Sequence, residues 1–88
     1  MAEVWRMKGF ADFQNGNYSR SEEANIQALN INSNDINTKK YLALAILSQG
    51  KEVEGMKLLT EVAQKGDQDA IDKLEELKHA YHRRYLNY

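Results

Sequence analysis

Residues 5–31 decide the fold, and they read WRMKGFADFQNGNYSRSEEANIQALNI. The stretch predicts one helix, a tight turn around Gly16, and a second helix that packs back against the first. The same pattern recurs 34 residues later, where Gly50 corresponds to Gly16 and Ala45 to Ala11. Periods of this length are typical of stacked structural repeats. The sequence therefore predicts a repeat architecture.

The composition excludes several classes of protein. A length of 88 residues suits a single domain over 1–88, near the lower limit for a core without covalent staples. The absence of cysteine excludes disulfides and thiolate metal sites. With 12 basic and 13 acidic side chains, the chain is not built mainly to neutralise phosphates. No apolar run approaches the roughly 18 residues of a membrane span, and no signal-peptide pattern is present, so we expect a soluble, cytoplasmic protein without membrane contact.

Glycines and capping residues predict five helices. Three of the helices end at glycines that can adopt the left-handed conformation, and they cover 2–15, 36–49 and 52–65. The second helix is expected to begin at Ser19, which would form a capping box with Glu22. Asp35 and Asp67 are the expected caps of the third and fifth helices. The fifth helix runs from about 68 towards the C-terminus.

The third helix contains seven consecutive apolar residues, 41–47. An amphipathic surface helix would show polar residues on one side of such a run. We therefore expect this helix to be surrounded by other helices, or to leave one face free for a partner.

At this period the residues resemble the tetratricopeptide repeat family, whose signature combines tryptophan, glycine and tyrosine positions with small residues in the second helix. The matching residues of the first copy are Trp5, Gly9, Ala11, Gly16, Tyr18, Ala28 and Leu29. Those of the second copy are Leu42, Ala43, Ala45, Gly50, Gly55, Leu59 and Ala63. The resemblance implies an all-α fold, a right-handed α-α superhelix of two helix-turn-helix repeats, 2–33 and 36–67, plus a C-terminal capping helix over 68–86.

The first copy departs from the family pattern at three positions that are normally apolar. Lys8, Asp12 and Asn25 occupy them, and Lys8 and Asp12 lie four residues apart on one helical face. We expect these side chains to satisfy one another as a polar cluster, the alternative being a recognition site for a charged group. Nearby Gly9 costs about 1 kcal/mol relative to alanine within a helix, which indicates that another helix approaches closely there.

In this family the first helix of each repeat lines a concave groove that holds a peptide or an amphipathic helix. Carried over by register, the resemblance implies a set of partner-binding residues: Arg6, Phe10, Phe13, Gln14, Asn37, Lys40, Leu44, Leu47, Leu74, Lys78 and Tyr81. The centre of this set is apolar and its fringe is basic, which suits a partner segment with acidic residues. The implied function is protein binding, as an adaptor, a scaffold or a chaperone-like protein.

Three alternatives stay open for this apolar stripe. The last helix or the tail could fill the groove and turn the stripe into ordinary core. Two grooves could associate with each other and form a homodimer. The chain could also be a structural fragment of a longer repeat array whose neighbours cover these faces.

Other chemistries receive less support from the sequence. No catalytic motif, glycine-rich phosphate loop or cofactor signature is present, so we expect neither an enzyme nor a cofactor. His79 and His82 are three residues apart, but two histidines without further ligands are more often surface residues than a metal site. The tail interleaves basic and aromatic residues, and nucleic-acid binding through it is a minor alternative.

Overall fold

The structure, a computed structural model, describes residues 1–85 apart from the side chains of Tyr81 and Tyr85. All regular structure in this part of the chain is helical, which confirms the expected all-α fold. The helices are α1 (Ala2–Gln14), α2 (Tyr18–Ile31), α3 (Ile36–Ser48), α4 (Glu52–Gln64) and α5 (Gln68–Tyr85). The expected capping helix extends to 86, and that last residue lies outside the described residues.

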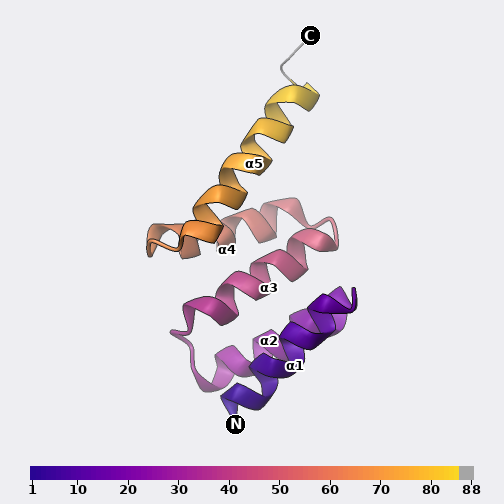
Figure 1. Cartoon of the computed structure of the whole chain (residues 1–88), viewed down its shortest axis with the longest axis vertical. Coiled ribbons are helices and arrows are strands. Elements are labelled where there is room, and N and C mark those ends of the chain that lie inside the picture. The colour runs from indigo at the N-terminus through magenta and orange to yellow at the C-terminus, as the bar shows by residue number, and fades with distance from the viewer. Residues whose placement is uncertain (86–88) are drawn as a thin grey trace.

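The order of the helices in space follows their order in the sequence (Figure 1). Helices α1 and α2 form one helix-turn-helix pair and α3 and α4 form the next, while α3 also packs on α1 and α2. Helix α5 packs on α4, and its yellow end extends away from the other helices in Figure 1. Such neighbour-to-neighbour packing is the arrangement of repeat proteins. A right-handed superhelical course stays a prediction.

The turn between the two helices of each pair depends on a glycine. Gly16 and Gly50 have φ angles of 79° and 83°, in the left-handed region that a side chain makes unfavourable. They lie 34 residues apart, as the repeat requires. The predicted glycine stops after the first and third helices are confirmed, and Gly66 ends α4 in the same way.

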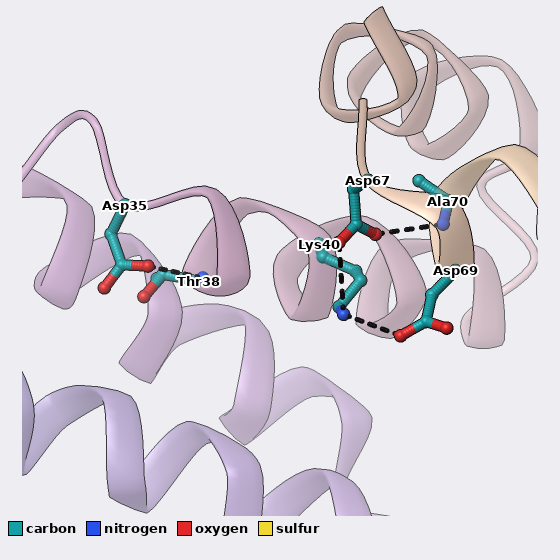
Figure 2. A network of polar contacts seen from close by, with 6 residues as sticks. All are labelled: Asp35, Thr38, Lys40, Asp67, Asp69 and Ala70. Carbon is teal, nitrogen blue, oxygen red and sulfur yellow. Dashed lines mark hydrogen bonds and ion pairs between the residues drawn. The ribbon is translucent and has the colours of Figure 1, made fainter. Parts of the chain in front are cut away.

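Two aspartates cap α3 and α5, the first helices after each helix pair, as the sequence predicts (Figure 2). The backbone N–H of Thr38 donates to Asp35 Oδ1 at 3.2 Å, at the start of α3. The N–H of Ala70 donates to Asp67 Oδ2 at 3.0 Å, at the start of α5. Each carboxylate satisfies one N–H that has no partner within its own helix.

The predicted capping box of the second helix is wrong. Helix α2 begins at Tyr18, its N-cap residue is Asn17, and no side chain caps it. The chain turns at Gly16, and the first helical hydrogen bond already runs from the N–H of Ser21 to the carbonyl of Asn17, at 2.9 Å. Ser19 consequently lies inside the first turn, and its hydroxyl cannot act as the cap.

The hydrophobic core lies between α3, α4 and α5. Ala43, Leu59, Val62 and Ala70 are fully buried there. Helix α3 contacts α1, α2 and α4, so neighbouring helices cover much of the most apolar helix. Leu44 of the same helix stays partly exposed.

Gly9 allows α1 and α2 to approach closely, as its cost within a helix predicts. The Ser21 hydroxyl donates to the Gly9 carbonyl at 2.7 Å. A Cβ atom added to Gly9 would lie only 2.6 Å from Asn25 Oδ1. Real Cβ atoms do not approach other atoms so closely, so a side chain at this position would have to displace the buried Asn25 amide.

The expected polar cluster forms only in part. Lys8 and Asp12 make an ion pair of 2.8 Å along α1. Asn25 does not join them, because its amide is buried against Gly9 and donates to the Ser21 hydroxyl at 3.3 Å. Within the described residues, Asn25 Oδ1 has no hydrogen-bond partner. The prediction is therefore right for the helical pair and wrong for Asn25.

This contact gives a test of the close approach. Replacing Gly9 with alanine should lower the free energy of unfolding by about 1–2 kcal/mol, because overpacking outweighs the roughly 1 kcal/mol that alanine adds in helix propensity. Urea unfolding followed by circular dichroism measures the change. In an Asn25→Ala background the clash is gone, and Gly9→Ala should stabilise instead. A stabilising Gly9→Ala in the original chain would contradict the close packing.

Candidate protein-binding groove

A groove runs between α1 and α3, on the face formed by the first helix of each pair. We call it the α1–α3 groove; its volume is about 630 Å³. Its walls are formed by Arg6, Met7, Phe10, Ala11, Asn37, Lys40 and Tyr41. Four of these residues, Arg6, Phe10, Asn37 and Lys40, are among those that the resemblance implies as partner-binding.

Aromatic side chains hold the floor of the α1–α3 groove in place. The rings of Phe10 and Tyr41 meet edge to face, with their centroids 5.2 Å apart. Tyr41 also meets Phe13 at 5.9 Å, and Phe13 meets Tyr18 at 5.4 Å. Phe10 nevertheless remains 43% exposed. A large aromatic ring is thus fixed by its neighbours and still open to solvent.

A second hollow continues the same face towards α5. We call it the α3–α5 hollow; it holds about 310 Å³ between Phe13, Leu44, Leu47, Ser48, Glu52, Lys73 and Leu77. The contact between Phe13 and Tyr41 joins it to the α1–α3 groove. Helix α5 therefore forms a wall of this hollow. In the part of the chain that the structure describes, α5 contributes no residue to the walls of the α1–α3 groove.

The two cations of the α1–α3 groove are paired with aspartates of the same chain. Arg6 Nη1 lies 3.1 Å from Asp35 Oδ2. Lys40 Nζ lies 3.0 Å from Asp69 Oδ2 and 3.6 Å from Asp67 Oδ1, as Figure 2 shows. Lys40 is only 9% exposed. It ties α3 to the start of α5 and is not free to meet a ligand.

These pairs shift two pKa values. Burial alone would raise the pKa of Asp35, but the Thr38 N–H and the Arg6 guanidinium outweigh it and hold this pKa below its usual range. Burial alone would lower the pKa of Lys40, but the hydrogen bond to Asp69 and the charge of Asp67 outweigh it and raise this pKa. Both groups are therefore charged at neutral pH, and their pairing stabilises the fold.

Among the described side chains, the other residues expected to bind a partner do not line the α1–α3 groove. Gln14 and Lys78 are exposed, whereas Leu74 is half-buried and packs against the hydrophobic core. The side chain of Tyr81 lies outside the described residues. Leu44 and Leu47, by contrast, do line the α3–α5 hollow.

The predicted set of partner-binding residues omits three residues of the α1–α3 groove, Met7, Ala11 and Tyr41. Met7 and Tyr41 lie 34 residues apart and occupy the same position in their repeats. The repeat period alone would not have found this pair, because neither residue is the counterpart of an expected one.

Other chemical sites find no further support among the described residues. His79 and His82 are exposed, and this part of the chain contains no group of three or more side chains placed to hold a metal ion. Among the helices described, none combines the length and the apolar character needed to cross a membrane.

The lowered pKa of Asp35 predicts acid sensitivity. A carboxylate with a depressed folded-state pKa stabilises the fold fully above its unfolded pKa of about 3.9, and this stability is lost as the pH falls through the lower, folded value. Asp35→Asn keeps a capping side chain but removes the charge. Its free energy of unfolding should fall less between pH 5 and pH 2 than that of the original chain. An equal fall in both proteins would contradict the pairing.

Lys40 supplies the matching test at high pH. Because its folded-state pKa is raised, its contribution is complete below the unfolded pKa of about 10.4 and is lost as the pH rises through the folded value. Thermal unfolding between pH 9 and pH 12 should therefore show a loss of stability that Lys40→Met reduces. Lys57→Met changes an exposed lysine of α4 and serves as the control.

Comparison with known proteins agrees with the repeat plan. The chain is similar to a TPR repeat-containing protein of Methanocaldococcus jannaschii, with 34% identity over 58 residues. The matched segment is 66% of this chain and only 10% of that protein, so the chain spans a tenth of the relative's length. No family model matches the chain, and no solved structure matches it significantly. The chain is an all-helical repeat protein, similar to the tetratricopeptide repeat family in its sequence and in its succession of helices.

Proposed function

We propose that this chain is a protein-interaction module that holds a short segment of another protein, helical or extended, in the α1–α3 groove. The observation that carries the proposal is Phe10, which is 43% exposed although Tyr41 fixes its ring. Ordered aromatic side chains that remain accessible lose little entropy on binding and dominate the energetics of many interfaces. The relative's name as a TPR repeat-containing protein supports the same class of function.

The binding face that we propose includes the α3–α5 hollow. Phe13 and Tyr41 join the two hollows, so a segment anchored on Phe10 could continue over Leu44 and Leu47. Arg6, Gln14 and Asn37 would contact the polar side of that segment. Lys40 has a structural role in this proposal, since its ammonium group is paired within the chain.

The wider roles that suit such a module are those of an adaptor, a scaffold or a chaperone-like protein. These roles, a place in the cytoplasm and the absence of catalysis are proposed from the resemblance to repeat proteins. The domain division into repeats 2–33 and 36–67 with a capping helix over 68–86 is part of the same proposal.

Selection from a displayed peptide library tests the groove, because it requires no known partner. We expect the selected peptides to bind Phe10→Glu at least about tenfold more weakly, since one lost anchor of 1.4 kcal/mol or more costs that factor. The fold should survive, because the ring is already half exposed. Val53→Glu on α4, where the side chain is 86% exposed, is the matched control. Equal binding by Phe10→Glu and the original chain would exclude this groove.

Self-association is a second candidate, favoured by the exposed apolar side chain of Val4 on α1. Val4 is 62% exposed, whereas its counterpart one repeat later, Thr38, is 1% exposed. An apolar position that is open in one repeat and buried in the other is suited to contact with another copy of the chain.

Light scattering over a hundredfold concentration range separates this candidate from the first. If α1 forms the contact, the molar mass should rise with concentration in the original chain and stay monomeric in Val4→Glu. The control is again Val53→Glu, which should associate like the original chain. A strict monomer at every concentration would remove self-association and leave the groove proposal unaffected.

A further inference from the structure

Carboxylates outnumber cations around the α1–α3 groove. The cations are Arg6 and Lys40, and both are already paired. The carboxylates that pair with them are Asp35, Asp67 and Asp69. The rim that looks basic in the sequence is therefore neutralised by residues of the next turn.

Two of the carboxylates at this rim remain accessible. Asp69 touches Lys40 with one oxygen, but its side chain is 79% exposed. Glu3 is exposed on α1, seven residues before Phe10 and so on the same helical face. Its counterpart one repeat later, Asn37, lines the groove. Within the described residues, no ion pair includes Glu3.

The other two carboxylates, Asp35 and Asp67, should attract a cationic ligand less strongly. Asp35 and Asp67 cap α3 and α5, and the positive ends of these helices offset part of their charge. An incoming segment consequently meets two accessible carboxylates near the groove: Asp69 beside Lys40, and Glu3 on the face of α1 that carries Phe10. Both are negative, and the floor of the groove, formed by Phe10, Met7 and Tyr41, is apolar.

Resting on the proposed function of this groove, we infer that its occupant is a basic segment, with lysine or arginine side chains flanking its apolar anchors. Such a segment places its cations beside Glu3 and Asp69 while its apolar side chains meet Phe10. An acidic segment, which the basic fringe of the sequence suggests, would find both groove cations already paired, Lys40 with Asp69 and Asp67 and Arg6 with Asp35. It would also bring its charge close to two carboxylates, which is unfavourable.

Two synthetic helical peptides test this inference. They carry identical apolar residues, and their remaining positions are lysine in one peptide and glutamate in the other. By fluorescence anisotropy at 50 mM salt, we expect the lysine peptide to bind at least about fivefold more tightly. The difference should shrink towards unity at 1 M salt, where the screening length falls to about 3 Å.

Variants at the rim connect this preference to particular residues. Asp69→Asn and Glu3→Gln should each weaken the lysine peptide by about two- to fivefold. Asp69→Asn should also strengthen the glutamate peptide, because it partly frees Lys40. Glu61→Gln removes an equal charge from the exposed surface of α4 and should change neither peptide. Asp69 is so exposed that its replacement should leave the helical circular dichroism spectrum intact.

The outcomes separate this inference from the proposed function. If both peptides bind and both need Phe10, but without a preference or with a preference for glutamate, the groove stands and the basic partner is wrong. If neither peptide binds, or if Phe10→Glu leaves binding unchanged, the groove itself is not the docking site and both proposals fall.

Discussion

The arrangement of the helices depends on two aspartates, each of which caps one helix and forms an ion pair with another. Asp35 caps α3 and pairs with Arg6 of α1, and Asp67 caps α5 and lies 3.6 Å from Lys40 of α3. One carboxylate thus both starts a helix and ties it to the equivalent helix of the preceding pair. These ties lie at the end of the turn that follows each helix pair. Arg6 and Lys40, which line the α1–α3 groove, are both held by them, so the same aspartates cap the helices and position two residues of the candidate groove.

Sequence reasoning succeeded where the deciding chemistry is local. A glycine stop or a cap acts within three or four residues, and the roles of Gly16, Asp35 and Asp67 were predicted for that reason. It failed for Lys40, whose partner Asp69 lies 29 residues further on. Helical register places a side chain on a face, but it does not tell which charges of the next turn meet it there. The sequence did contain a hint of this pairing, since Arg6 and Asp35 are separated by the same 29 residues as Lys40 and Asp69.

The position of the candidate groove was predicted from the sequence, whereas the pairing of its charged residues was not. Register placed Phe10 and Asn37 correctly on the face between α1 and α3. It could not show that Tyr41 holds Phe10 by its edge, because that contact depends on the angle at which two helices cross. Nor could it show that the groove's cations are neutralised. Four of the residues expected to bind a partner do line one groove, and the basic partner that we infer for it is opposite in charge to the one that the sequence suggests.

At one buried position the first helix pair has a polar residue and the second pair has an apolar one, and this difference affects local unfolding. Asn25 and Leu59 lie 34 residues apart and are both fully buried, but Asn25 contributes less apolar surface and leaves Oδ1 unpaired. An unpaired buried polar atom costs about 1–3 kcal/mol. Among the described residues, Thr38 Oγ1 of α3 is also buried without a partner, so the two pairs differ mainly in the apolar surface that Leu59 adds. On that ground we expect the α1–α2 pair to open by local unfolding before α3 and α4 do. A segment bound across α1 and α3, as we propose, would stabilise this pair by mass action and so link binding to the order of α1 and α2.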